Sequence, residues 1–307
     1  MTREEINEEK QKKIFQENNK ETAKKIIKKT IKIIVIVAIL GTLFFSYNAF
    51  ISTAKIKVRE YRIINEKIPD SFNGTKIIQF SDLHYGSTMF EENLKQIKKQ
   101  IDKRKPDIIV FTGDLIDNNF EITTEEKETL TKRLKELDAR LGKYAILGDE
   151  DLEEVTTIFN QSDFVVLKNE YDLIYNEKNE PILLIGLSSL LKKEQDIESG
   201  YSYFKQETYN SNIYTITLVH EPDSFLDMKE SYSTDLVLAG HSHNGNIKIP
   251  FINYPLGRRD GAKKYNNDFY EIGNTELYIS SGLGTNNMAG IRLFCRPSIN
   301  FYRISNK

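Results

Sequence analysis

The chain has 307 residues, of which 29% are charged, and its 43 Lys and Arg residues against 45 Asp and Glu residues give a formal net charge of −2. This near-neutral, mixed charge is not that of a dedicated nucleic-acid binder, so no nucleic-acid partner is expected and a nuclease is disfavoured. The single cysteine, Cys295, excludes an intramolecular disulfide and a cysteine-rich zinc site.

The N-terminal part divides into two segments of opposite character. Residues 1–30 consist largely of Glu, Lys, Asn and Gln, which predicts a charged tail that is disordered or forms a fraying helix. Residues 31–52 are mostly apolar and have roughly the length of a transmembrane helix. A buried core helix and a cleavable signal peptide are the alternatives, but the long charged segment and the lack of a small-residue cleavage site favour an uncleaved, single-pass anchor.

Basic residues flank this segment on both sides. Five lysines from Lys24 to Lys32 precede it, and Lys55, Lys57, Arg59 and Arg62 follow it. This modest bias predicts a cytoplasmic N-terminus and an extracytoplasmic domain over residues 57–305, held at the cell membrane.

Strands and helices alternate in the first half of that domain. A half-exposed strand is expected at 57–64, followed by buried strands at 76–80, 107–111 and 143–147. Helices are expected between the buried strands, at 91–104 and from a capping box at Thr123 and Glu126 to about Leu141. This order implies parallel strands with right-handed crossovers, whose carboxyl ends form a ligand-binding edge.

Acidic residues follow each of the three buried strands. Asp82 and His84 follow the first, Asp114 follows the second, and Asp149 to Asp151 follow the third. One Asp after a strand is usually a helix cap or a turn residue. Three in succession at one sheet edge instead indicate a functional site.

The other three histidines also follow predicted strands. Several short strands are expected between 164 and 187, a polar helical excursion at 191–211, and a strand at 213–219 that ends in His220. A strand at 235–239 leads into a glycine-rich turn with His241 and His243, and antiparallel strands are expected at 276–280, 291–294 and 298–304. Paired neutral imidazoles in such a turn can hold metal ions, although a polar turn is the alternative.

The ordered set of motifs resembles the calcineurin-like metallophosphoesterase superfamily over roughly residues 58–305. The set comprises Asp82-x-His84, Gly113-Asp114, Gly148 to Asp151, His220 and Gly240-His241-x-His243. The C-terminal part is similar in character to the small membrane-associated bacterial phosphoesterases of the YkuE and YaeI type. The resemblance implies an α/β fold, a four-layer α/β/β/α sandwich with a two-metal site at the strand ends.

The resemblance also implies the metal ligands. The first ion would be held by Asp82, His84 and His243, with Asp114 bridging to a second ion held by Asp149, His220 and His241. Mixed His and Asp ligation suits Mn, Fe or Zn better than Ca, and Mn is favoured. Two divalent ions about 3.5–4 Å apart can clamp the phosphoryl oxygens and turn a bridging water into an in-line nucleophile.

One motif departs from the family pattern. Gly148-Asp149-Glu150 stands where the family has Gly-Asn-His, so a neutral ligand is replaced by an anion and a histidine is absent. We expect tighter metal binding and weaker attraction for phosphate. Glu150 could protonate the leaving group only if it stayed protonated itself, and Asp151 is the other candidate acid.

The sequence therefore predicts a metal-dependent phosphoric ester hydrolase that is membrane-anchored and acts on a phosphomonoester or phosphodiester through a metal-bridging hydroxide. The predicted anchor suggests a lipid-linked or envelope substrate. The alternative is a metal-binding but catalytically degenerate protein with a binding or regulatory role. Arg292 could orient an anionic head group of the substrate, but a solvated position on the surface is the more frequent role of such a residue.

Overall fold

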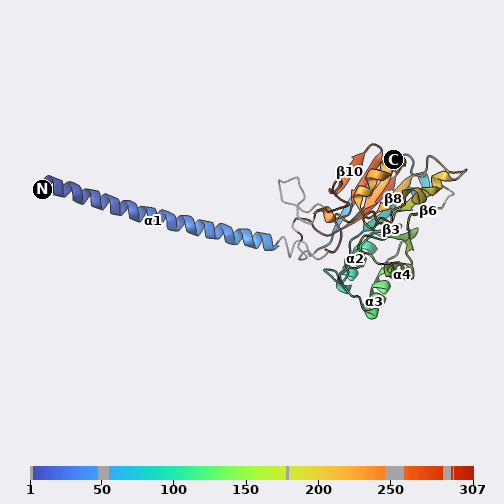
Figure 1. The fold of residues 1–307 in the computed structure, drawn as a ribbon, viewed down its shortest axis with the longest axis horizontal. Helices are drawn as coiled ribbons and strands as arrows, with labels where there is room; N and C mark the ends of the chain where they lie inside the picture. The colour runs from blue at the N-terminus through green and yellow to red at the C-terminus, as the bar shows by residue number, and fades with distance from the viewer. Residues whose placement is uncertain (1–2, 48–54, 178–179, 246–258, 286–291, 293) are drawn as a thin grey trace. The chain divides into compact units, whose positions relative to one another are not determined.

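The computed structural model describes residues 3–47, 55–177, 180–245, 259–285, 292 and 294–307. The chain separates into two units, Met1–Asn48 and Ala49–Lys307. The first unit contains one long helix, and the second contains both sheets and the remaining helices (Figure 1).

The helix of the first unit is α1 (Arg3–Ser46), which continues without a break through residue 30. Among the described residues, no helix combines the length and the apolar character needed to cross a membrane. The anchor predicted over 31–52 is therefore not supported by the described residues. Residues 48–52 lie outside the described residues, and the membrane location stays a prediction.

The second unit is built on two six-stranded sheets. The first has the order β1-β12-β2-β3-β4-β5. Its strands are β1 (Lys57–Ile64), β2 (Thr75–Phe80), β3 (Ile108–Thr112), β4 (Gly142–Ile146), β5 (Val165–Val166) and β12 (Ser298–Ser305). Strands β2, β3 and β4 are parallel, as predicted, and β5 pairs parallel with β4. β12 runs antiparallel to β2 and parallel to β1.

The second sheet has the order β10-β11-β9-β8-β7-β6. Its strands are β6 (Glu170–Ile174), β7 (Ile182–Gly186), β8 (Thr215–Val219), β9 (Leu236–Ala239), β10 (Phe269–Ile272) and β11 (Thr275–Ile279). β11 is antiparallel to β10 but parallel to β9. The prediction that the C-terminal strands are antiparallel is therefore wrong for the pairing of β11 with β9. The hairpin of β10 and β11 brings the chain back alongside β9 in the same direction.

The prediction of a strand at 291–294 is also wrong at the two positions of this range that the structure describes. Arg292 and Phe294 belong to no strand, and residues 291 and 293 lie outside the described residues. The Arg292 guanidinium donates to the carbonyls of Ser281 and Gly284 instead. These contacts hold this segment against a turn rather than in a β-ladder.

Helices cover the outer faces of both sheets. The α-helices of this unit are α2 (Glu91–Asp102), α3 (Thr124–Lys135), α4 (Glu154–Gln161), α5 (Ile197–Gly200) and α6 (Phe225–Ser231). The 3₁₀ helices in the described part of this unit are η3 (Asp70–Phe72), η4 (Ser202–Lys205), η5 (Pro222–Ser224) and η6 (His243–Gly245). The capping box at Thr123 and Glu126 is confirmed. α3 ends before the predicted Leu141, because the Leu141 amide donates to the Asp107 carbonyl at 2.7 Å and directs the chain into β4.

Three apolar clusters define the layers. Alternate β-strand residues point to opposite faces, so Ile78 packs with α2, α3 and α4 while its neighbour Ile77 packs between the sheets. Leu238 of β9 faces Ile77 across the inter-sheet core, and Val237 packs on the far side with Phe225 of α6. The layers are therefore helix, sheet, sheet and helix, and Figure 1 shows α2, α3 and α4 gathered beside β3.

Candidate metal centre

All seven predicted metal ligands lie just beyond strand ends, and the structure brings them into two groups. Ligand atoms of Asp114, Asp149, His220 and His241 lie within 4.8 Å of one another; we call this the His220 cluster. The same holds for Asp82, His84 and His243, which we call the His84 cluster. Both sheets contribute, because β2, β3 and β4 carry the acidic residues while β8 and β9 carry His220, His241 and His243.

Asp149 occupies a ligand position in the His220 cluster. Its Oδ1 lies 3.1 Å from His220 Nε2 and 3.0 Å from His241 Nδ1. The anion that replaces the family's neutral ligand thus points at both imidazoles rather than away from them.

Asp114 lies between the two clusters. Its Oδ2 is 3.2 Å from His220 Nε2 and 3.8 Å from His84 Nε2. His243 Nε2 in turn lies 3.1 Å from His84 Nε2 and 3.4 Å from Asp82 Oδ1. The Asp114 carboxylate is therefore placed to serve both groups, as the sequence predicted for the bridging ligand.

Backbone carbonyls orient two of the imidazoles. His220 Nδ1 donates to the Thr112 carbonyl and His241 Nε2 donates to the Asp260 carbonyl, each at 2.7 Å. Because a carbonyl can only accept, each of these nitrogens carries its proton. The opposite nitrogen of each ring then faces Asp149, and it is the nitrogen that a metal ion would use once that nitrogen has lost its proton.

The donor set fits a divalent cation. His220 Nε2, His241 Nδ1 and Asp149 Oδ1 are buried, lie at contact distances, and yet do not meet with hydrogen-bond geometry. Buried polar atoms are normally hydrogen-bonded. A cation between these atoms would explain why they converge without hydrogen-bonding one another, and His with carboxylate is the ligand chemistry of Mn, Fe or Zn.

The backbone at this edge adopts a conformation that non-glycine residues rarely take. Five of the seven ligands have a positive φ, namely Asp82 (49°), His84 (44°), Asp114 (61°), His241 (61°) and His243 (44°). Each such residue costs of order 1–3 kcal/mol, and residues of this kind concentrate at functional sites. This backbone conformation directs the side chains of the ligands toward one another.

Gly113 allows two strand ends to meet. Its φ is +91°, and a Cβ there would lie 2.2 Å from His220 Nδ1. We expect Gly113→Ala to displace His220 and to weaken metal binding at least about tenfold. Calorimetric titration with Mn²⁺ would measure this. Gly74→Ala is the matched control, because Gly74 also has a positive φ (+81°) but open space around a Cβ; equal loss in both variants would contradict the steric explanation.

Proton affinities in the His220 cluster follow from burial and charge. Burial alone would raise the pKa of Asp149, but the imidazoles of His220 and His241 beside its carboxylate outweigh burial and hold that pKa well below its usual value. Burial opposes protonation of His220, yet the Asp114 and Asp149 carboxylates raise its pKa well above the ordinary value. The pKa of His241 is also raised, against burial, by Asp149.

Metal binding should therefore release protons. A ligating imidazole must be neutral, so an ion has to displace the protons that the raised pKa values of His220 and His241 retain near neutral pH. We expect metal affinity to fall as the pH is lowered below neutrality and to rise above it. Calorimetry at pH 7 in two buffers of different ionisation enthalpy measures the release; identical heats would contradict it.

Glu150 belongs to a third group with His84 and Asp117. Its Oε2 lies 3.3 Å from His84 Nδ1, on the side of the ring opposite the metal-facing nitrogen. Asp117 was not predicted; it is buried, and its Oδ2 has no hydrogen-bond partner among the described residues. The signal for it was a second acid three residues after Asp114 in the same loop.

Asp151 holds the loops together. Its carboxylate accepts from the amides of Asp114 at 2.8 Å, Leu115 at 2.7 Å and Gly148 at 2.9 Å. Burial, together with the Asp114 charge, raises the pKa of Asp151 to about 6, although the amide donors oppose the shift. With both oxygens engaged by backbone, Asp151 is placed to position the Asp114 loop.

Arg292 is not a surface residue. It is buried, with 3% exposure, and its Nη2 lies 3.1 Å from His243 Nδ1. A guanidinium can only donate, so His243 Nδ1 accepts from Arg292. Burial and the nearby Arg259 lower the pKa of His243 well below its usual value, and His84 and Arg292 add to this.

Comparison with known proteins agrees with this geometry. The sequence model of the calcineurin-like phosphoesterase family matches residues 75–245. The metallophosphoesterase YkuE of Bacillus subtilis (strain 168) is 31% identical over 267 residues, covering 85% of this chain and 90% of its own. A metallophosphoesterase of Aquifex aeolicus (strain VF5) is 29% identical over 273 residues, covering 84% and 95%.

A further relative has a named substrate. The UDP-2,3-diacylglucosamine pyrophosphatase LpxG of Chlamydia trachomatis serovar D (strain ATCC VR-885 / DSM 19411 / UW-3/Cx) is 26% identical over 239 residues, covering 61% of this chain and 70% of its own. The family match includes β2, β3, β4, β8 and β9, the strands that carry the two histidine clusters. The chain belongs to the calcineurin-like phosphoesterase family.

Proposed function

We propose that the chain is a hydrolase of phosphoric esters that works with two divalent metal ions. One ion would be held by the His84 cluster and the other by the His220 cluster. The observation that carries the proposal is the Asp114 carboxylate, whose Oδ2 faces a histidine of each cluster. When bound, two such ions stabilise charge on the phosphoryl oxygens and activate a water molecule as nucleophile.

The residues of the chain hold and orient this site. The Thr112 and Asp260 carbonyls fix the tautomers of His220 and His241, and Asp151 fixes the loop that presents Asp114. All of the histidine side chains here are at most 5% exposed, so the ligands lie away from bulk water. A preorganised site of this kind lowers the reorganisation needed during reaction.

We assign to Glu150 the role of protonating the leaving group, in place of the histidine that the family pattern has at this position. Its contact with His84 Nδ1 gives it a second role, because a carboxylate on the remote nitrogen orients a ligating imidazole. Asp151, engaged by three amides, is the less suitable acid.

For the substrate we propose a phosphodiester or pyrophosphate bond joined to a lipid. The support is the similarity to LpxG, which is named for a diacylated sugar nucleotide, and not a membrane anchor. The family alone leaves both a phosphomonoester and a phosphodiester open.

The test uses the full chain with Mn²⁺, Fe²⁺ or Zn²⁺ added in turn. Turnover is compared on p-nitrophenyl phosphate, bis-p-nitrophenyl phosphate and a diacylated sugar nucleotide in detergent micelles. We expect phosphodiester turnover and a higher kcat/KM for the lipid. Equal or faster cleavage of the water-soluble diester would remove the support for a lipid substrate.

The altered motif favours one alternative. The extra negative charge of Asp149 strengthens metal binding and weakens the attraction for phosphate, and Glu150 replaces a histidine that could act as the acid. Both changes favour a protein that binds metal without rapid turnover. Bound metal with no hydrolysis of any ester, across several metals and pH values, would establish that binding or regulatory role instead.

A further inference from the structure

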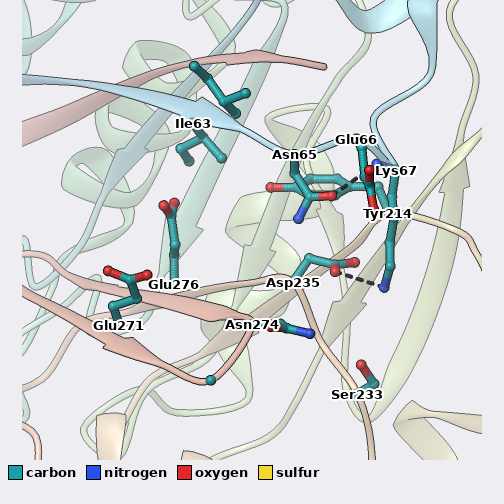
Figure 2. Close-up of a pocket in the computed structure, with 12 residues that line it drawn as sticks. Ile63, Asn65, Glu66, Lys67, Tyr214, Ser233, Asp235, Glu271, Asn274 and Glu276 are labelled. Carbon is teal, nitrogen blue, oxygen red and sulfur yellow. Dashed lines mark hydrogen bonds and ion pairs between the residues drawn. The ribbon is translucent and has the colours of Figure 1, made fainter. Parts of the chain in front are cut away.

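A second pocket lies at the opposite end of the strands from the metal centre. It opens where β1 ends, at Ile63 to Lys67, and where β8 and β9 begin, at Tyr214 and Asp235. The turn between β10 and β11 closes one side (Figure 2). Its volume is about 400 Å³, within the range of small-molecule sites.

The pocket is strongly acidic. Four carboxylates line it against one ammonium, which gives a formal charge of −3; the carboxylates are Glu66, Asp235, Glu271 and Glu276, and the ammonium is Lys67. Lys67 Nζ is already paired with Asp235 Oδ1 at 2.9 Å. The remaining carboxylates carry the excess charge.

Two of these carboxylates face each other across a hairpin. Glu271 of β10 is directly opposite Glu276 of β11 in the antiparallel register, so both side chains lie on one face. Like charges placed directly opposite are destabilising. Among the described residues no cation pairs with either, and the one hydrogen bond to them is a long contact of 3.4 Å from the Tyr278 hydroxyl to Glu276.

A buried hydroxyl also lacks a partner at this place. Tyr214 is fully buried, and its hydroxyl has no hydrogen-bond partner among the described residues. Figure 2 shows this hydroxyl directed into the pocket, away from the Lys67 end. A buried hydroxyl without a partner is costly, and a ligand that donates to it removes the cost.

We propose that this pocket binds an aliphatic diamine or polyamine, with one ammonium between Glu271 and Glu276 and donating to the Tyr214 hydroxyl. The Lys67–Asp235 pair shows the same recognition within the chain itself. The apolar side chain of Ile63, together with the Tyr214 ring, supplies a wall for the hydrocarbon part.

A divalent metal fits this pocket less well. Within the part of the chain that the structure describes, every group of three or more potential metal ligands lies at the metal centre, and none includes Glu271, Glu276 or Asp235. These carboxylates are thus too dispersed for one small ion. An extended organic cation can reach them.

The experiment is calorimetric titration of the full chain with spermidine and with 1,4-diaminobutane. We expect saturable binding of one molecule per chain, weakened about tenfold or more by Glu276→Gln and by Glu271→Gln. Tyr214→Phe, which removes only the hydroxyl, should weaken binding several-fold. Glu230→Gln on α6, an exposed glutamate, is the matched control and should bind as the parent does.

Folding is checked in the same variants by thermal unfolding without amine. Relief of the Glu271–Glu276 repulsion should leave Glu276→Gln at least as stable as the parent. Equal weakening in Glu230→Gln, unchanged binding in both pocket glutamate variants, or displacement of spermidine by equimolar Mg²⁺ would each overturn the proposal.

Discussion

Replacing Asp114 by Asn is expected to lower phosphodiester turnover on the order of 10³-fold. The substitution keeps the size of the side chain but removes the charge from the oxygen that faces both His84 and His220. A neutral amide oxygen at this place is a much weaker ligand for two cations than the charged carboxylate oxygen. Metal content, measured by elemental analysis after dialysis, should fall from two ions per chain to at most one.

The matched control is Asp102→Asn, at the end of α2. Asp102 is half exposed and pairs with Lys98. This variant should keep both metal content and turnover, since exposed ion pairs contribute little. Retention of two ions and of full turnover in Asp114→Asn would contradict the bridging role.

Replacing Glu150 by Gln separates the two roles open to that side chain. Gln cannot give up a proton but still offers an oxygen to His84 Nδ1. If Glu150 protonates the leaving group, turnover should fall about 10²–10⁴-fold while metal content is kept. If it only orients His84, Gln should be nearly neutral, whereas Glu150→Ala should weaken metal binding about 10–100-fold.

We expect the first result, with the largest loss on substrates whose leaving group needs a proton. A p-nitrophenolate leaving group needs little protonation, so the loss should be smaller on bis-p-nitrophenyl phosphate than on an alkyl ester. Glu153→Gln, an exposed neighbour that pairs with Lys168, is the control. Undiminished turnover of Glu150→Gln on both esters would remove Glu150 from the acid role.

The parallel strands and the metal ligands could be predicted because they depend on local patterns. Short apolar runs ending in Asp82, Asp114 and Asp149 identify strand ends, and parallel strands bring such ends to one edge. The capping box at Thr123 is equally local. These features do not require knowledge of which distant segments meet.

The features that were missed depend on distant contacts. Arg292 was read as a surface residue, because nothing in its neighbours shows that it packs against His243, 49 positions earlier. The facing of Glu271 and Glu276 follows from a hairpin that was not predicted. Among the described residues no helix is long and apolar enough to span a membrane, so the anchor over 31–52 is not supported there and stays a prediction.

The central claim is that this chain hydrolyses phosphoric esters with two metal ions. The most direct test is the metal stoichiometry of the purified full chain together with phosphodiester turnover, before chelation, after chelation and after Mn²⁺ is restored. We predict two ions per chain at saturation, turnover lost with the metal, and turnover recovered as the second ion is taken up. Turnover that survives complete removal of metal, or saturation at a single ion, would contradict the account.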